Sequence, residues 1–432
     1  MNATETLTFK DQLLSHFEQQ LPSLFGDAGL RKESAALFEK TGFPNRKWED
    51  YKYINPDAVL KSGFGFRKEL MRDLTANDIK EFTFVENAIV VVLLNGVFSE
   101  QFSSLKNLPK GITISNLADA VVSNEVARAH YAQHAKVESD PFIALNTAMN
   151  EGGVFIHVTK NTQTKIPIQV IHISNSEVAT ISQARNLFVI EENAEAVVIE
   201  SYETIGPVKT FSNPVTETYV AANAKFDHYR IQSQGENALM LNTLQASVCE
   251  NSLYNTYTFT LGGNFVRNNL NILFTGKNGE AHLYGLYPIA NSQVVDNHTI
   301  VDHAVPHCMS NELYKGVVND KATATFNGKI FVRQDAQKTN AYQTNRNILL
   351  SDDATVNTKP QLEIYADDVK CSHGTSTGKV NEDAMFYLQA RGIGKESARA
   401  LLIRAFAEEV VDQVKIEELR EYIDSRIDLI LK

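Results

Sequence analysis

Residues 191–202 read EENAEAVVIESY, and this stretch holds the pattern that decides the fold. A polar turn, Glu192-Asn193, is followed by the small residue Ala194 and then by a segment in which apolar and polar side chains alternate. Such alternation over roughly four to eight residues is typical of a half-buried strand. The stretch therefore predicts a turn followed by a strand at residues 196–202.

The same unit recurs through the middle of the chain. Further strands are predicted at residues 225–232, 253–261, 322–332 and 361–365, with short polar turns between them. The small residues that follow the turns are spaced by 30, 28, 29, 41 and 32 residues, a weak repeat with one insertion: Ala194, Ala224, Ser252, Ala281, Ala322 and Ala354. Such a period without a long helical run fits the stacked rungs of a β-solenoid. A β-sandwich, whose strands also alternate, is the alternative that spacing leaves open.

Both ends of the chain differ from this middle part. Apolar residues at helical spacing, such as Leu13, Phe17 and Leu21, occur near the N-terminus. We expect a mostly helical region at residues 1–150, the solenoid at 151–383 and a helical domain at 384–432.

The C-terminal segment predicts two amphipathic helices. The first has this apolar stripe: Ala398, Leu401, Leu402, Ala405, Phe406, Val410 and Val414. The second has a line of its own: Ile416, Leu419, Ile423, Ile427 and Ile430. A stripe of this kind packs on a neighbouring element or docks a partner, and terminal helices also cap solenoids. The two roles are compatible.

The composition excludes several classes of protein. The chain has 432 residues and a formal net charge of −11, so it lacks the clustered positive charge that nucleic-acid binding needs. Its most apolar run, residues 88–94, is far shorter than the roughly 18 residues of a membrane-spanning helix, and its first residues do not resemble a signal peptide. Three cysteines, Cys249, Cys308 and Cys371, argue against a disulfide framework. We therefore expect a cytoplasmic protein that binds neither nucleic acid nor membrane.

Residues 374–380, GTSTGKV, resemble a phosphate-binding P-loop only superficially. A P-loop needs a longer spacer between its glycines and a hydroxyl residue after the lysine. Here three residues separate Gly374 from Gly378, and Val380 follows Lys379. The chain is not expected to bind ATP in this way.

Three imidazoles, a carboxylate and a thiol lie close together in the sequence: His298, Asp302, His303, His307 and Cys308. Imidazole and thiolate are ligands that zinc and iron prefer. Pro306 excludes a continuous helix, whereas in a strand His303 and His307 would share a face and Cys308 would point the other way. The alternative is that these side chains form hydrogen bonds along a solenoid turn and hold no metal.

Cys371 and His373 lie two residues apart, so on a strand they face the same side, about 7 Å apart between Cα atoms. Such a pair can direct a sulfur and an imidazole toward one metal centre. Lys370 beside it would favour the thiolate. The alternative is an ordinary strand end with a buried cysteine.

Several separated blocks of the chain occur in an order that resembles a known family. One block runs from Pro360 through Cys371-Ser-His373-Gly374 to Ile393. Others lie upstream, at residues 42–53, 144–148, 302–308, 313–316, 326–330 and 338–341. Together they are similar to the SufB/SufD family, the scaffold subunits of SUF iron–sulfur cluster assembly, over nearly the whole chain.

Within this family the resemblance favours the SufD branch. Cys371-Ser-His373-Gly374 matches that branch, and SufB carries a sulfur-accepting cysteine that has no counterpart here between Cys308 and Cys371. Residues 375–377 depart from the residues that are usual in the family, which loosens the detail of that loop.

The resemblance implies a right-handed parallel β-helix with α-helical N- and C-terminal regions. It implies a non-catalytic scaffold that pairs with a SufB-like paralogue and carries a SufC-like ATPase on its C-terminal helices, with these residues in contact: Ala398, Leu401, Leu402, Ala405 and Phe406. Alone, the chain could instead form a homodimer.

The resemblance also implies a site. A transient iron–sulfur cluster or iron would form at the heterodimer interface, with His373 as a ligand and Cys371 as the second candidate, and nothing would bind tightly to the isolated chain. His303, His307 and Cys308 are weaker metal candidates. The alternative function is a metal-dependent enzyme that uses His298, His303 and His307.

Overall fold

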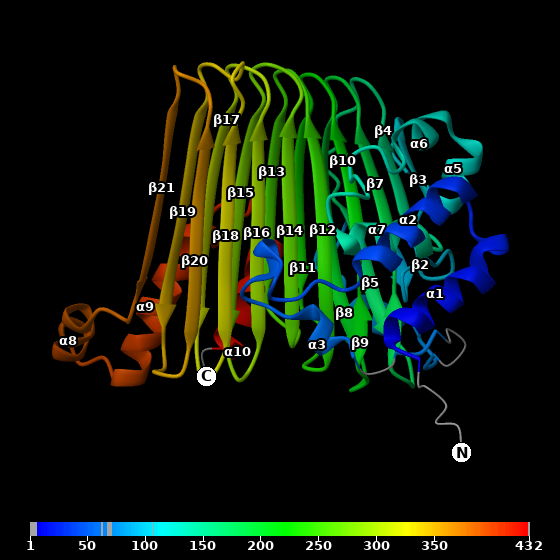
Figure 1. Cartoon of the computed structure of the whole chain (residues 1–432). Coiled ribbons are helices and arrows are strands. Elements are labelled where there is room, and N and C mark those ends of the chain that lie inside the picture. The colour runs from blue at the N-terminus through cyan, green and yellow to red at the C-terminus, as the bar shows by residue number, and fades with distance from the viewer. Residues whose placement is uncertain (1–6, 62–63, 67–70, 107, 431–432) are drawn as a thin grey trace.

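Two β-sheets wind into one solenoid in the computed structural model, which describes residues 7–61, 64–66, 71–106 and 108–430 (Figure 1). The ten-stranded sheet has the order β2 (Val97–Phe98), β1 (Ile89–Leu94), β5 (Ile168–Asn175), β8 (Glu195–Ile205), β11 (Lys225–Gln232), β13 (Leu253–Thr260), β15 (Glu280–Ile289), β17 (Met309–Val318), β19 (Asn340–Leu349) and β21 (Lys370–Gly378). The eleven-stranded sheet has the order β20 (Thr355–Ile364), β18 (Thr323–Val332), β16 (Val294–His303), β14 (Phe265–Phe274), β12 (Ala238–Val248), β10 (Val215–Val220), β7 (Arg185–Ile190), β4 (Val154–Val158) and β3 (Ile112–Asn116). In addition, β9 (Thr210–Ser212) pairs with β12, and β6 (Thr180–Ser182) pairs with β9.

From β10 onward, consecutive strands alternate between the two sheets. Each rung therefore lies parallel and in register on the rung before it, and antiparallel pairs occur only at β1–β2 and β3–β4 among the described strands. The predicted parallel solenoid flanked by helices is confirmed.

The polar turns fold as the opening stretch predicts. Asn193, Asn223 and Asn278 occupy the left-handed region, each with φ of 58°, a conformation that asparagine tolerates better than most residues. Their amides also form a ladder: Asn278 Nδ2 donates to Asn251 Oδ1 at 3.0 Å, and Asn251 Nδ2 to Asn223 Oδ1 at 3.2 Å. The turn asparagine thus sets both the bend and the stacking of successive rungs.

The predicted insertion in the repeat is wrong. Ala194, Ala224 and Ser252 precede strands of the ten-stranded sheet and Ala281 lies in one, whereas Ala322 and Ala354 precede strands β18 and β20 of the other sheet. The spacing of 41 residues therefore compares two different sides of the solenoid. Within one sheet the repeat continues, because Ala281 pairs with Ser310 and Ser310 with Ala341.

The predicted strands are confirmed with one change of extent. The segments expected at residues 225–232, 253–261 and 322–332 correspond to β11, β13 and β18. The segment expected at 361–365 is only the end of β20, which begins at Thr355. The sequence analysis missed the first half of β20 because that half is polar and is followed by Pro360. Proline is tolerated here because β20 is an edge strand, so no further strand needs the N–H group that proline lacks.

Most of the N-terminal helices cover the outer face of the eleven-stranded sheet, whereas Ile79 of the fourth helix packs against Val92 and Ile171 of the ten-stranded sheet. Phe9, Phe38 and Phe142 pack with Phe211 of β9 and Leu241 of β12. The helices of this region are α1 (Phe9–Gln20), α2 (Ala28–Thr41), α3 (Pro56–Val59), α4 (Ala76–Glu81), α5 (Leu117–Ser123), α6 (Glu125–His130) and α7 (Pro141–Met149), with two short 3₁₀ turns, η1 (Leu21–Ser23) and η2 (Glu49–Tyr51).

The C-terminal helices lie against the outer face of the ten-stranded sheet. Val410 of α9 (Lys395–Val411) and Ile423 of α10 (Glu417–Ile430) are buried with Tyr229, Tyr257 and Leu286 of that sheet. The preceding helix, α8 (Glu382–Ala390), extends away from the strands (Figure 1). Among the helices that the structure describes, none combines the length and apolar character needed to cross a membrane.

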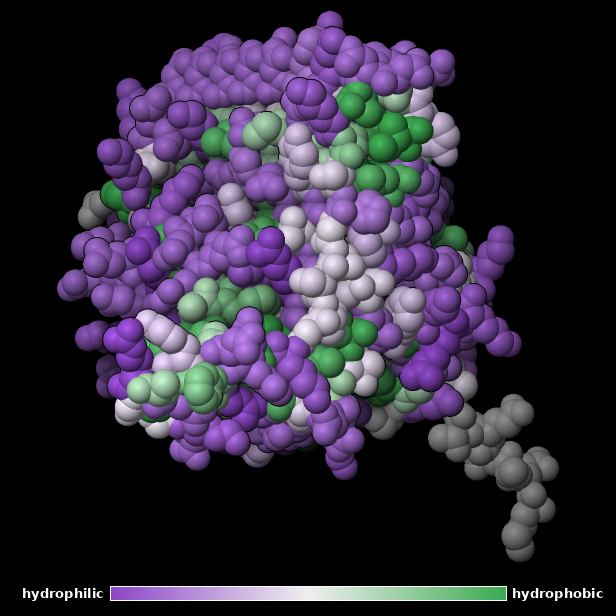
Figure 2. Space-filling view, turned by 90° about the vertical axis from the view of Figure 1, so that its left-hand side faces the viewer, coloured by the Kyte–Doolittle hydropathy of each residue, from purple (hydrophilic) through white to green (hydrophobic). Residues whose placement is uncertain are grey.

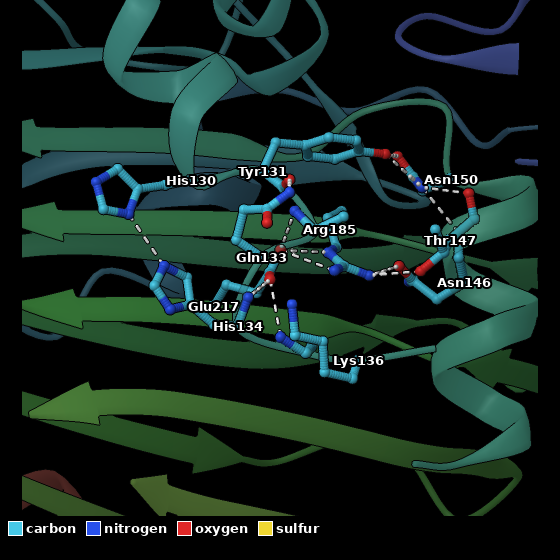
Figure 3. A network of polar contacts seen from close by, with 12 residues as sticks. His130, Tyr131, Gln133, His134, Lys136, Asn146, Thr147, Asn150, Arg185 and Glu217 are labelled. Atoms are coloured by element: carbon cyan, nitrogen blue, oxygen red, sulfur yellow. Dashed lines mark hydrogen bonds and ion pairs between the residues drawn. The ribbon is translucent and has the colours of Figure 1, made fainter. Parts of the chain in front are cut away.

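A fully buried ion pair fastens the N-terminal region to the solenoid (Figure 3). Arg185 Nη2 of β7 lies 2.7 Å from Glu217 Oε2 of β10, and both side chains are wholly buried. Arg185 also donates to Thr147 Oγ1 of α7 at 3.0 Å, while Glu217 accepts the backbone N–H groups of Ala132, His134 and Ala135. Burial alone would raise the pKa of Glu217, but the Arg185 charge and these hydrogen bonds lower it.

We predict that Glu217→Gln lowers the free energy of unfolding by about 3–5 kcal/mol, because it leaves the Arg185 charge buried without its partner. Urea denaturation measures the change. Lys160→Ala is the control: it removes the exposed pair of Lys160 and Glu192 and should cost less than about 1 kcal/mol. A similar small loss in both variants would contradict the structural importance of the buried pair.

Candidate functional site

The solenoid ends in an open rung at β20 and β21. These are the last strands of the two sheets, and no other described strand pairs with their outer edges. Large apolar side chains are exposed on the rungs beside this end, with Tyr342 at 42%, Ile364 at 39% and Tyr365 at 60%. Figure 2 looks onto this end and shows green apolar patches and a pale band among hydrophilic residues. The end is a mixed surface of the kind that protein partners cover.

Strand β21 places both predicted ligands on the side facing the solenoid interior. It pairs in register with β19, where Cys371 lies beside Ala341 and His373 beside Gln343. Because side chains alternate along a strand, Cys371 and His373 share one face, as predicted. The strand then ends, and Asn381 caps α8 by accepting the N–H of Ala384 at 2.9 Å.

The environment of Cys371 differs from the one predicted. Its side chain packs against a small apolar cluster that includes Ile330, Val332 and Ala341. Burial there raises the pKa of the thiol. The expectation that Lys370 favours the thiolate is therefore wrong, because apolar surroundings outweigh a lysine on the opposite face of the strand.

His373 is exposed at the open end. Imidazole and sulfur are suitable donors for iron and iron–sulfur centres, so the chemistry of this pair fits such a cargo. Among the described residues, no group of three or more His, Cys, Asp or Glu side chains could hold a metal ion. Cys371 and His373 are therefore a pair of candidate ligands without a third such side chain grouped with them among the described residues.

The structure does not bring together the histidines of residues 298–308. Strand β16 ends at His303, whose Nε2 lies 2.9 Å from Ser310 Oγ inside the solenoid. His298 lies on the outer face, 3.7 Å from Asp50 Oδ1, and His307 is exposed in a turn with φ of 63°. The buried Cys308 thiol points to the carbonyl of Gly276 at 3.4 Å. His303 and Cys308 therefore form hydrogen bonds, as the alternative interpretation predicts, and the three histidines do not converge on one point.

Burial also lowers the pKa values of two of these histidines. It lowers the pKa of His303 to about 3, and burial together with Arg267 lowers that of His298 well below its usual range. Both imidazoles are therefore neutral at physiological pH, one on each side of the β16 strand.

Helix α9 divides the predicted apolar stripe between two faces. Ala398 and Val410 are buried, but Leu401 is 49% exposed, Ala405 is exposed, and Leu402 and Phe406 are half-buried. The helix packs through Ala398, Ile403, Ala407, Val410 and Val411, of which the sequence analysis missed Ile403, Ala407 and Val411. The outward face of α9 keeps apolar side chains available for contact, whereas Ala398 is not available.

Lys315 of β17 fixes α9 to the sheet. Its side chain is almost fully buried, and Nζ donates to the carbonyl of Phe406 at 2.7 Å, forms an ion pair with Glu409 and lies 4.4 Å from the Phe406 ring centroid. The bond to Lys315 lowers the pKa of Glu409. The sequence reading did not single out this lysine, although it lies in the block 313–316 that carries the family resemblance.

We predict that Lys315→Met loosens α9, because methionine keeps the apolar stem but loses the ammonium group. Hydrogen exchange should show α9 amides opening more easily by about 1.5–3 kcal/mol, the contribution of a buried hydrogen bond from a charged group. The control is Arg346→Ala, which removes an exposed partner of the same Glu409 and should cost less than about 1 kcal/mol. Unchanged exchange in Lys315→Met would contradict the prediction.

Comparison with known families covers most of the chain. Residues 172–406 match the family model "SUF system FeS cluster assembly, SufBD core domain", and residues 11–170 match "SufBD protein N-terminal region". The chain is similar to an iron–sulfur cluster assembly SufBD family protein of Synechocystis, with 31% identity over 90% of this chain and 88% of that protein. It is also similar to the iron–sulfur cluster assembly proteins SufD of Escherichia coli, at 29% identity over 95% of both chains, and of Bacillus subtilis, at 26% identity over 74% of both.

Proposed function

The chain belongs to the SufBD family, which supports a role in SUF iron–sulfur cluster assembly, and we propose that it acts there as a non-catalytic scaffold subunit. A SufB-like paralogue would pair with it, a SufC-like ATPase would supply ATP hydrolysis, and the nascent cluster or its iron would be held between the two scaffold chains. The cluster is the cargo of this assembly rather than a resident cofactor. The observation that carries the proposal is the incomplete ligand pair, Cys371 and His373, on an unpaired end of the solenoid.

The open rung supports pairing through this end. Strands β20 and β21 present free backbone groups at the edges of both sheets, which a second solenoid can extend. Such a junction would place ligands from the partner opposite His373 and would cover the exposed Tyr342, Ile364 and Tyr365. A second copy of this chain could occupy the same end when the paralogue is absent.

The C-terminal helices support docking of the ATPase. Phe386 of α8 is 74% exposed, Tyr387 is 58% exposed, and Leu401 of α9 adds a third uncovered apolar side chain. Exposed aromatic side chains of this kind commonly act as interface anchors. Since α9 is fastened to β17 through Lys315, a partner that moves the helix would act on the sheet that ends in β21.

We predict that His373→Ala lowers the yield of reconstituted cluster in the complex with SufB-like and SufC-like partners. Mutation of a residue that hydrogen-bonds to a metal ligand typically reduces metal affinity by roughly 10–100-fold. Loss of the ligand itself should therefore lower the yield of cluster at least about tenfold. The charge-transfer absorbance of the cluster and its iron and sulfide content measure the yield. His307→Asn, at an exposed turn histidine, is the control. Wild-type yield from His373→Ala would remove His373 from the mechanism.

We predict that Leu401→Asp and Phe386→Ser each weaken binding of the ATPase. Truncation of an interface anchor costs about 2 kcal/mol or more, or roughly thirtyfold in affinity. Co-purification and titration calorimetry with the SufC-like partner measure the effect. Val122→Asp, at a residue of α5 that is 68% exposed, should bind like wild type. If both helix variants also bind like wild type, the ATPase docks elsewhere.

A further inference from the structure

The 3₁₀ turn η2 lies over the outer face of the eleven-stranded sheet, in the blue loop that crosses in front of that sheet (Figure 1). Contacts with three strands hold it there. Arg267 Nη1 of β14 donates to the carbonyl of Asp50 at 2.8 Å, and His298 Nε2 of β16 lies 3.7 Å from Asp50 Oδ1. Glu49 forms an ion pair with Lys359 of β20. The last contact brings the turn to the edge strand of the sheet.

Trp48, the residue directly before this turn, is 38% exposed and is the only tryptophan of the chain. Tryptophan is highly buried on average, so its exposure beside an open edge is informative. The backbone that follows it is well anchored, since Tyr51 donates its hydroxyl to Asp140 Oδ2 at 2.5 Å and its ring centroid lies 4.4 Å from the Arg267 guanidinium. A large side chain on such a fixed backbone loses little conformational entropy on binding, and tryptophan is enriched among interface anchors.

The outward face of β20 continues this surface to the end of the strand. Lys359, Glu363 and Tyr365 share that face because side chains alternate along a strand. Glu363 forms an ion pair with Lys329 at 2.9 Å, and the ring centroids of Tyr365 and Phe331 are 5.4 Å apart. The charged side chains named on this face are thus paired with others of this chain, whereas Tyr365 remains 60% exposed.

A further strand that pairs with β20 would lie about 4.8 Å beyond it, with its outward side chains beside those of Lys359 and Tyr365. Glu49 already contacts Lys359, so the tryptophan before it lies next to the path of such a strand. Because the charges on this face are already paired, we expect that strand to present apolar rather than charged side chains to it.

We propose that Trp48 is an anchor of the junction with the SufB-like paralogue, where the paralogue strand that extends the eleven-stranded sheet covers the indole ring. The N-terminal region would then take part in an interface that otherwise consists of β20 and β21. This inference rests on the proposed function, because that function supplies the partner at the open end.

The test labels the full chain with 5-fluorotryptophan, which gives a single ¹⁹F resonance because the chain has one tryptophan. The change in its chemical shift between H₂O and D₂O measures the access of solvent to the ring. Addition of the unlabelled paralogue should reduce that change to about half or less, since an interface anchor is desolvated on binding. An unchanged value in a chain that has bound the paralogue would overturn the proposal.

Titration calorimetry supplies a second readout. Trp48→Ala should weaken binding of the paralogue roughly thirtyfold, as the loss of an interface anchor does, and Trp48→Phe should recover most of the affinity because it keeps an aromatic ring. Ile166→Ala is the matched control, because Ile166 is 42% exposed and precedes β5, near the other end of the ten-stranded sheet. Wild-type affinity in Trp48→Ala would contradict the proposal.

The same measurements separate this proposal from the proposed function. If the wild-type chain does not bind the paralogue, the proposed pairing and the role of Trp48 are both wrong. If it binds and the ¹⁹F resonance does not respond, only the role of Trp48 is wrong. If the resonance responds to the concentration of this chain alone and the paralogue adds no further change, Trp48 contacts a second copy, and the assignment to the paralogue is overturned.

Discussion

Parallel strands in register satisfy their backbone N–H and C=O groups only when another strand lies on each side, and the whole solenoid depends on this constraint. At the N-terminal end the sheets finish in the antiparallel strands β2 and β3. At the other end, β20 and β21 leave their outer edges without a described partner strand. Proline is one of the residues that limits indiscriminate edge pairing, and Pro360 lies in β20. A second chain can therefore pair with this end, but Pro360 restricts which strands can do so.

The same constraint connects the open end to the helices outside it. Helix α9 is held by Lys315 on β17, and the start of α10 is held by Lys415, which lies 2.8 Å from Asp227 on β11. The strands between these anchors are β13 and β15, and β19 and β21 continue the sheet beyond β17. A force on the helices would therefore be shared by several hydrogen-bonded strands. Under the proposed function, this is how an ATPase on the helices could move the rung that carries His373.

How far the sequence predicted the structure depended on the distance between interacting residues. Turn asparagines such as Asn193 and Asn223 act through their own backbone, so local pattern was enough to find the rungs. The face of α9 and the thiol environment of Cys371 depend on which strand lies beneath, so the face was predicted only in part and the prediction for the thiol was wrong. Lys315 and the pair of Arg185 and Glu217 join residues that are far apart in sequence, and local spacing contains no information about such pairs.

Hydrogen bonds between polar side chains inside the solenoid help to determine which residue of β21 faces the interior at the open end. Glu200 of β8 is fully buried and accepts from His172 Nε2 at 3.3 Å and His228 Nε2 at 2.8 Å, and these bonds lower its pKa although burial opposes them. A slip of one residue between β8 and β11 would turn such side chains to the other face and leave the imidazoles without an acceptor.

Polar groups inside a core can specify register at a cost in desolvation, and here they do so several rungs from the site. From His228 a single in-register column continues through Thr256, Leu283, Glu312 and Gln343 to His373. Because each strand takes its register from the one before it, the hydrogen bonds of Glu200 help to fix a histidine, rather than Ser372 or Gly374, at the interior-facing position of the last rung.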